Sequence, residues 1–264
     1  MLNLKNVSVT FNANTPNEVR ALRKLNLDVH EGDFVTVIGA NGAGKSTLFN
    51  VIAGTIAIDS GAIVLEDIDV SNFPEYQRSL NIGRVFQNPS LGTCPGLTIR
   101  ENLSLAAMRG KSLGLSKGVK KANNEWFHHL VSSVNLGLEE RLDTDVSLLS
   151  GGQRQAITLI MATMMKPKIL LLDEHTAALD PNAAAQVIEL TVQLALEHKL
   201  TVIMITHSMQ QAVAVGNRVV MMDRGQVLFD IAGEEREMLQ YHDLIERFRS
   251  LRTGTELSDR AVLS

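Results

Sequence analysis

The 264-residue sequence predicts an α/β fold in which a parallel sheet carries a helical insertion. Short apolar segments with the composition of strands alternate with helical patterns towards both ends of the chain. Between about residues 88 and 165, helical spacing replaces that alternation. We therefore expect one large domain over residues 1–232, with a helical subdomain inserted at about 88–165, followed by a C-terminal segment at 233–264.

The first part of the chain predicts strands, a glycine-rich turn and a helix. The segments "LNLKNVSVTF" and "ALRKLNLDV" alternate apolar and polar residues, as half-buried strands do. "DFVTVIG" is a dense apolar run that predicts a buried strand, and "KSTLFNVIAG" has helical spacing that ends at Gly54. "GAIVLEDIDV" and "IGRVFQ" each predict a further short strand.

The second part predicts helices first and then a return to alternating strands and helices. Helical spacing covers "TIRENLSLAAM", "NNEWFHHLVSSVNLGL" and "GGQRQAITLIMATMMKP", the last of which we expect to end at Pro167. "KILLLDE" and "TVIMITH" predict strands on either side of a helix over "NAAAQVIELTVQLALEH". "NRVVMMDRGQVLFD" predicts a hairpin that turns at Arg224 and Gly225.

The segment "EEREMLQYHDLIERFRSLR" predicts an amphipathic C-terminal helix. A helix packed on the core is the favoured interpretation, and a helix that binds a partner is the alternative. The final "TGTELSDRAVLS" is typical of a frayed tail. One face of the predicted helix would carry Met238, Tyr241, Leu244, Ile245, Phe248 and Leu251.

Composition narrows the function classes. The net charge is −4 and no long Lys/Arg block is visible, so we expect no nucleic-acid partner. Cys94 is the single cysteine, which fits a reducing compartment. No apolar run reaches the roughly 18 residues of a membrane span, and the N-terminus lacks the pattern of a signal peptide. We expect a cytoplasmic protein.

The stretch "GANGAGKST" has the spacing of a phosphate-binding loop, Gly39-x-x-x-x-Gly44-Lys45-Ser46, between a predicted strand and a predicted helix. Glycines allow successive backbone N–H groups to turn towards one anion. Lys45 would meet the β- and γ-phosphates, Ser46 a Mg²⁺ ion and Thr47 the α-phosphate. This loop alone fits a GTPase, a kinase or an ATPase. The remaining loop residues expected to contact nucleotide are Asn41, Gly42 and Ala43.

A pair of carboxylates, Asp173 and Glu174, ends the predicted buried strand "KILLLDE". One carboxylate at a strand end can hold a water on Mg²⁺, and its neighbour can polarise the attacking water of hydrolysis. Ligands gather at the carboxyl ends of parallel strands, so we expect this pair and the phosphate loop to meet at one crevice.

The segment Leu149-Ser150-Gly151-Gly152-Gln153 follows, at the start of a predicted helix. With the phosphate loop and "LLLDE" in that order, the chain resembles the ATP-binding cassette (ABC) ATPases from about residue 2 to residue 230. The resemblance implies a P-loop NTPase of ABC type, with a RecA-like parallel sheet, an antiparallel β subdomain and an inserted helical subdomain. Physically, Ser-Gly-Gly at a helix start offers a second anion site.

The resemblance also implies partners and further site residues. Two copies would form a head-to-tail homodimer around two ATP molecules, each held by the phosphate loop of one copy and the Ser150–Gln153 signature of the other. Gln87 matches a glutamine that joins Mg²⁺ and links the core to the helical subdomain. Asp180 matches a loop at the dimer interface, His207 a histidine that contacts the γ-phosphate, and Phe11 an aromatic residue that stacks on adenine, although a strand-end phenylalanine is often a core residue.

Within the family, the run "LSGGQRQAITLIMATMMKPKILLLDEHTAALDP" is similar to ATPases of bacterial uptake systems of the tryptophan/tyrosine type, which are related to branched-chain amino-acid importers. His175 stands where many members have proline, and we interpret it as a variant turn residue. The resemblance implies an ATPase subunit peripheral to the cytoplasmic face of the inner membrane. A separate permease would be its partner, and an extracytoplasmic solute-binding protein would be an indirect one. The alternatives are a soluble ABC ATPase of DNA repair, translation or cluster assembly, and a nonhydrolysing regulatory cassette.

Overall fold

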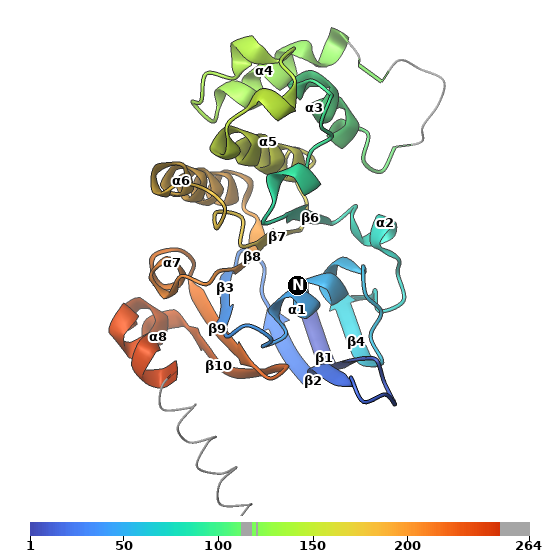
Figure 1. Ribbon diagram of the computed structural model, residues 1–264, viewed down its shortest axis with the longest axis vertical. Helices are drawn as coiled ribbons and strands as arrows, with labels where there is room; N and C mark the ends of the chain where they lie inside the picture. The colour runs from blue at the N-terminus through green and yellow to red at the C-terminus, as the bar shows by residue number, and fades with distance from the viewer. Residues whose placement is uncertain (112–117, 120, 249–264) are drawn as a thin grey trace, which may run out of the picture.

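The computed structural model describes residues 1–111, 118–119 and 121–248, which form two sheets and the helices around them (Figure 1). The smaller sheet is antiparallel, in the order β2-β1-β4-β5. The larger sheet has the order β10-β9-β3-β8-β7-β6, with all neighbours parallel except β10 and β9. The predicted α/β fold with a parallel core sheet and an antiparallel β subdomain is confirmed. The strand bounds are β1 (Leu2–Phe11), β2 (Val19–Val29), β3 (Phe34–Gly39), β4 (Ser60–Leu65), β5 (Ile68–Asp69), β6 (Ile82–Val85), β7 (Ile169–Asp173), β8 (Thr201–Ile205), β9 (Arg218–Asp223) and β10 (Gln226–Ala232).

The parallel strands are apolar on both faces because each face has its own cover. In β7, Ile169 and Leu171 join a core cluster with α1 (Lys45–Ala53) and the antiparallel sheet. Leu170 and Leu172 join a second cluster, formed mainly by the helical region. The dense apolar runs of the sequence therefore indicate central strands, whereas β1 alternates because its outer face is more exposed.

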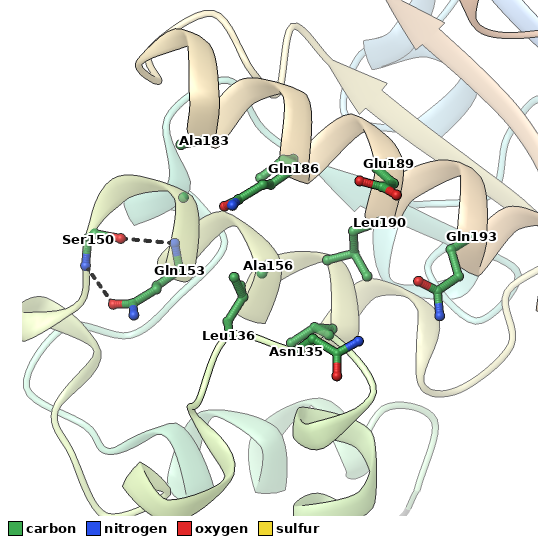
Figure 2. Close-up of a pocket in the computed structure, with 13 residues that line it drawn as sticks. Asn135, Leu136, Ser150, Gln153, Ala156, Ala183, Gln186, Glu189, Leu190 and Gln193 are labelled. Atoms are coloured by element: carbon green, nitrogen blue, oxygen red, sulfur yellow. Dashed lines mark hydrogen bonds between the residues drawn. The ribbon is translucent and has the colours of Figure 1, made fainter.

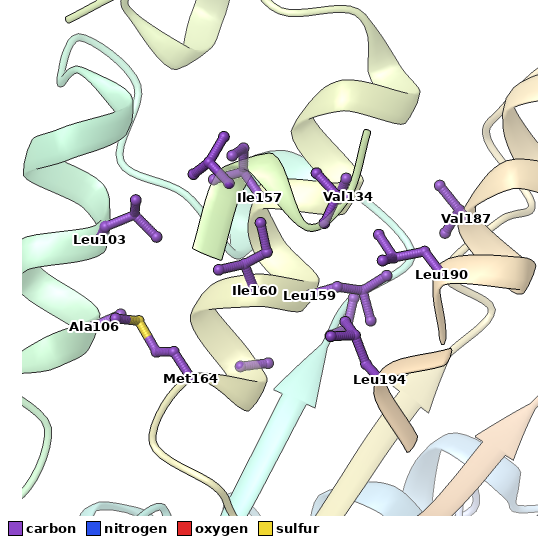
Figure 3. Close-up of a cluster of buried hydrophobic side chains, with 14 of the residues drawn as sticks. Leu103, Ala106, Val134, Ile157, Leu159, Ile160, Met164, Val187, Leu190 and Leu194 are labelled. Carbon is purple, nitrogen blue, oxygen red and sulfur yellow. The ribbon is translucent and has the colours of Figure 1, made fainter. Parts of the chain in front are cut away.

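The helical region lies between β6 and β7 in the chain and gathers at one end of the molecule (Figure 1). Its side chains interdigitate with those of α6 around one apolar cluster, in which Leu103, Ile160 and Leu190 come from three different helices (Figure 3). α5 ends at Thr163, four residues before Pro167. The helix bounds are α2 (Glu75–Arg78), α3 (Ile99–Ala107), α4 (Asn124–Ser132), α5 (Gly151–Thr163), α6 (Pro181–His198), α7 (Met209–Ala214) and α8 (Gly233–Met238).

The β9–β10 hairpin turns where the sequence predicts it. Arg224 and Gly225 both have positive φ, 45° and 80°. Two positive φ values in succession are typical of the turn that matches the twist of paired strands. The turn packs against the glycine loop after β3, where Gly225 N donates to Ala43 O at 2.9 Å.

The C-terminal segment differs from the single helix that the sequence predicts. α8 ends at Met238, and a second helical stretch covers residues 241–248. Leu239 and Leu244 are buried against α7 and β9, whereas Met238 is 71% exposed, so the predicted face is divided. The Gln240 N–H donates to Asp243 Oδ2 at 2.8 Å, which starts the second stretch with a side-chain cap. Leu251 and the predicted tail lie outside the described residues.

Candidate functional site

Four segments expected to carry the site follow neighbouring strands of the larger sheet. The phosphate loop follows β3, His207 follows β8, Glu174 follows β7 and Gln87 follows β6. Since β3, β8, β7 and β6 are adjacent and parallel, their carboxyl ends lie along one edge. The fold thus brings together residues that are up to 168 positions apart, between Gly39 and His207.

Three glycines of the phosphate loop adopt backbone conformations that other residues rarely reach. The φ values of Gly39, Gly42 and Gly44 are 153°, 80° and 99°. A Cβ atom on Gly39 would lie 2.3 Å from Met222 O, and one on Gly44 would lie 2.6 Å from Ala21 O. Both positions therefore require glycine for space as well as for conformation.

The helix that follows this loop begins without a side-chain cap. The N-cap of α1 is Gly44, so no side chain caps the first N–H groups, and no acidic residue lies in the first turn. The first N–H groups of a helix lack partners within the helix, and its N-terminal end carries partial positive charge. The loop and α1 thus fit an anion, and phosphate is the anion for which this arrangement is known.

Lys45 lies across the loop, with Nζ donating to Gly39 O at 2.7 Å and to Ala40 O at 3.0 Å. Burial lowers the pKa of Lys45, and the negative charges of Glu174 and Asp173 oppose that shift. The ammonium group therefore lies within electrostatic range of both carboxylates. A lysine in this position can exchange its two carbonyl partners for phosphate oxygens.

Asp173 and Glu174 leave the end of β7 in different directions. The pKa of Asp173 is raised by burial, against the lowering effects of Arg84, Lys45 and His207. Arg84 Nη2 is 3.7 Å from Asp173 Oδ2, longer than a hydrogen bond, so the carboxylate keeps acceptor capacity for other ligands. Glu174 has a φ of 47° and donates its N–H to Ile205 O at 3.1 Å, which ties the turn to β8.

Glu174 and His207 contact each other directly across the ends of β7 and β8. His207 Nε2 lies 2.5 Å from Glu174 Oε1. The Glu174 side chain is largely buried, whereas that of His207 is half exposed at the rim. The contact joins the carboxylate expected to polarise the attacking water and the histidine expected to contact the γ-phosphate.

The sequence did not indicate the hydrogen bonds that hold the segment around His207. The Thr206 hydroxyl donates to Gln211 Oε1 at 2.8 Å, and Ser208 caps α7 by accepting from Gln211 N at 3.2 Å. Gln211 Nε2 then reaches Thr176 Oγ1 at 3.5 Å, two residues after Glu174. A Ser that precedes the helix-forming run "MQQAVA" is the signal that would have predicted α7.

Gln87 follows β6 by two residues and is exposed. The carbonyl of the preceding Phe86 accepts a hydrogen bond from Gln155 Nε2 of α5, at 3.2 Å. Gln155 is fully buried, so this bond links the segment of Gln87 to the helix that begins with the signature. The structure thereby joins two motifs that are separated by the whole of α3 and α4.

Phe11 ends β1 on the antiparallel sheet and is 37% exposed, so it is not a core residue. Its cross-strand partner in β2 is Val19, which is also exposed. Together they form a small apolar surface on which a flat aromatic group could stack. Alternation in β2 does not distinguish Val19 from other exposed strand positions, which is why the sequence did not indicate it.

The signature segment begins α5 within the helical region, away from α1 in Figure 1. Ser150 and Gln153 form a capping box: Gln153 N donates to Ser150 Oγ at 3.3 Å, and Ser150 N donates to Gln153 Oε1 at 3.2 Å (Figure 2). Beside it, Asp180 caps α6 by accepting from Asn182 N and Ala183 N, both at 3.1 Å. A cavity of about 390 Å³ lies between these two helix starts and extends along α6.

Gly152 allows α5 and α6 to approach each other closely. A Cβ atom at this position would lie 2.9 Å from Ala183 Cβ. Such a separation is shorter than ordinary van der Waals contact, so any larger residue would displace one of the helices. Among the described residues, no helix has the length and apolar character needed to cross a membrane.

Comparison with known proteins agrees with this architecture. The profile of the family described as ABC transporter matches residues 22–177. The chain is 45% identical to the tyrosine transport ATP-binding protein of Clostridioides difficile, over 94% of this chain and 98% of that protein. It is 36% identical to the glutamine transport ATP-binding protein GlnQ of Geobacillus stearothermophilus, over 83% and 87% of the two chains.

A solved structure provides a spatial comparison. The ATP-binding cassette MJ0796, in a dimeric post-hydrolysis state bound to ADP and phosphate, superposes with a TM-score of 0.74 at 29% identity. The alignment covers 88% of this chain and 98% of that one. With a family profile across more than half of its length and a relative at 45% identity over nearly the whole chain, this protein belongs to the ABC transporter family, as one of its ATP-binding subunits.

Proposed function

We propose that this chain is the ATP-hydrolysing, energy-coupling subunit of an ABC importer for an amino acid or a similar small solute. The names of its tyrosine and glutamine transport relatives support the solute class. The observation that carries the hydrolytic part is the 2.5 Å contact between Glu174 Oε1 and His207 Nε2, at the strand ends beside Lys45.

ATP binding would use groups that the fold already presents. The open amides of the phosphate loop and the start of α1 receive the phosphates. Lys45 Nζ leaves Gly39 O and Ala40 O for the β- and γ-phosphate oxygens. Thr47 meets the α-phosphate, and Phe11 with Val19 supplies the apolar surface for adenine.

The residues around Asp173 fit a magnesium ion. The Ser46 hydroxyl, the Gln87 amide and the Asp173 carboxylate are oxygen donors, which Mg²⁺ prefers. Asp173 has spare acceptor capacity because Arg84 is held at 3.7 Å. When bound, Mg²⁺ would neutralise charge on the β- and γ-phosphate oxygens.

Glu174 and His207 would then have separate roles in hydrolysis. Glu174 orients the attacking water and accepts its proton. The hydrogen bond from Glu174 N–H to Ile205 O holds the turn that carries this carboxylate at the strand end. His207 donates to the γ-phosphate region, and it is held there by Thr206 and by the Ser208 cap of α7. Positioning and charge stabilisation, rather than covalent chemistry, are what phosphoryl transfer requires.

The homodimer is part of the proposal. Each ATP would lie between the phosphate loop of one copy and the Ser150, Gly151, Gly152 and Gln153 segment of the other, with Asp180 at the interface. Closure follows ATP binding because the nucleotide contacts both copies only in the closed state. The dimeric state of the MJ0796 cassette with ADP and phosphate supports this arrangement.

A permease would dock beside Gln87, on the surface formed by residues 88–101. Leu91 supports this placement because it lies there on the short helix Pro89–Leu91 and is 68% exposed. The subunit would work at the cytoplasmic face of the cell membrane, with an extracytoplasmic solute-binding protein as an indirect partner. Co-purification with a hydrophobic permease is expected, whereas ATPase stimulated by nucleic acid would favour a soluble repair or translation ATPase.

The deciding experiment replaces Glu174 with Gln and uses Glu197→Gln, an exposed position on α6, as the control. Glu174→Gln is expected to bind MgATP, to lose nearly all turnover and to elute as a dimer in size-exclusion chromatography with MgATP. Glu197→Gln should behave as wild type. A Glu174→Gln protein that stays monomeric and hydrolyses ATP normally would refute the assignment.

A further inference from the structure

His175 is a buried titratable residue beside the site that the mechanism above does not use. It is 2% exposed and immediately follows Glu174. Its Nε2 lies 3.0 Å from the hydroxyl of Thr191, which is fully buried in the middle of α6. The imidazole therefore connects the turn after β7 to a helix that begins six residues further along the chain, at Pro181.

The partners of the Thr191 hydroxyl determine which atom donates in its bond with His175 Nε2. The Thr191 hydroxyl donates its one hydrogen to Val187 O, at 2.7 Å. Its oxygen must then accept from His175, so Nε2 carries a hydrogen. The 3.0 Å contact is therefore a hydrogen bond from the His175 Nε2–H group to the Thr191 oxygen.

The turn that His175 anchors has an unusual conformation. Glu174 has a φ of 47°, in the left-handed region that favours glycine. A residue other than glycine persists there only when its surroundings hold it in place. The Glu174 N–H donates to Ile205 O, and Glu174 O accepts from Ala177 N. Within this turn, the His175 side chain reaches into the core.

We infer that His175 is a positioning residue, whose imidazole donates from Nε2 to Thr191 and thereby fixes the turn that presents the Glu174 carboxylate. The inference rests on the proposed role of Glu174. The hydrogen bond also reaches the expected dimer interface, because α6 begins next to Asp180. The same buried bond therefore also links the turn that carries the hydrolytic carboxylate to the interface helix.

The test removes the acceptor and keeps the shape. Thr191→Val deletes the hydroxyl, while Thr163→Val in α5 is its matched control. Thr163 is also buried and donates to the carbonyl four residues earlier, Leu159 O at 2.8 Å, without a histidine partner. Thr191→Val should lower kcat roughly ten-fold at unchanged KM for MgATP, since small displacements of a catalytic group reduce rates strongly. Thr163→Val should change neither constant, and Thr191→Ser should restore kcat.

Two further measurements separate the possible failures. In long-range ¹H–¹⁵N NMR spectra, the signal lost in His175→Gln should show a hydrogen on Nε2, and Thr191→Val should shift it. Equal kcat values for Thr191→Val and Thr163→Val, or an Nδ1–H form of His175, would overturn the inference while leaving the site intact. Normal turnover in Glu174→Gln would instead refute the proposed function on which it rests.

Discussion

The starts of α1 and α5 are both expected to bind a γ-phosphate, α1 that of the ATP on its own subunit and α5 that of the ATP on a second copy, yet they are built differently. Gly44 begins α1 with no side-chain cap, so the first amides are open. Ser150 and Gln153 close the start of α5 with a reciprocal capping box. The phosphate loop therefore leaves its amides open for the proposed nucleotide, whereas the signature pairs the N–H groups of Ser150 and Gln153 internally.

A third helix start shows that the box itself is not specific to function. Thr98 and Glu101 form the same motif at α3, with Thr98 N donating to Glu101 Oε2 at 2.8 Å. In α5 the corresponding bond from Ser150 N is 3.2 Å, and its acceptor is the neutral Gln153. The signature box is thus longer and carries no negative charge that would repel phosphate.

Lys45→Ala tests the phosphate loop and should have the largest effect. Loss of the ammonium group removes the charge that meets the β- and γ-phosphates, so we expect ATP affinity to fall about a hundred-fold or more. Titration with a fluorescent ATP analogue measures it. Lys24→Ala, at an exposed strand position, is the control. Retained ATP affinity in Lys45→Ala would contradict the proposed role of the phosphate loop in binding ATP.

Ser150→Ala tests the self-capped site, with Thr98→Ala as its structural match. Both variants should lose about 1 kcal/mol of unfolding free energy, the usual contribution of an N-cap. Only Ser150→Ala should also lower turnover, roughly ten-fold or more, with ATP affinity of the monomer unchanged. Chemical denaturation and steady-state ATPase assays measure the two effects. Equal turnover in the two variants would contradict the signature role.

Gly225→Ala tests how the phosphate loop is held from outside. A Cβ atom there would lie 2.6 Å from Ala21 O, in a residue with a φ of 80°. The bond from Gly225 N to Ala43 O should weaken, so ATP affinity should fall several-fold while dimer formation at saturating ATP is kept. Isothermal titration with Mg-ATP-γ-S measures it. Gly233→Ala, with positive φ and open space, is the control.

Gly42→Ala should have the smallest effect. Gly32→Ala separates the effect of backbone strain from the effect of a position in the phosphate loop. The φ values are 80° and 79°, and no atom lies within 4 Å of either added Cβ, so both variants carry the same strain of ~1 kcal/mol. Gly42 alone lies in the phosphate loop. A two- to three-fold loss of ATP affinity beyond that of Gly32→Ala would show that binding depends on the backbone conformation of Gly42, and an equal response would assign that loop position no role in binding.

Local signals account for the part of the fold that the sequence predicted. The loop from Gly39 to Ser46, the apolar runs of β7 and β8, and the positive-φ turn at Arg224 and Gly225 are each specified by neighbouring residues. The corresponding strands and turns lie where the sequence places them.

The parts that were missed depend on contacts between distant segments. The break at Leu239 has no glycine or proline to signal it, and it follows from burial of Leu239 and Leu244 against Ala212 of α7. Arg84 and Asp173 are 89 residues apart and meet only because β6 pairs with β7. A one-dimensional pattern does not contain such pairings.

Gln155 forms only part of its possible hydrogen bonds where the helical region meets the rest of the subunit. Its amide nitrogen bonds Phe86 O, but its buried Oε1 has no hydrogen-bond partner among the described residues. One neutral hydrogen bond contributes only about 1 kcal/mol, and an unsatisfied acceptor weakens the join further. A bond of that strength can break and re-form at little cost, so what holds the helical region against the sheet is mainly the shared apolar cluster that includes Leu170 and Leu172.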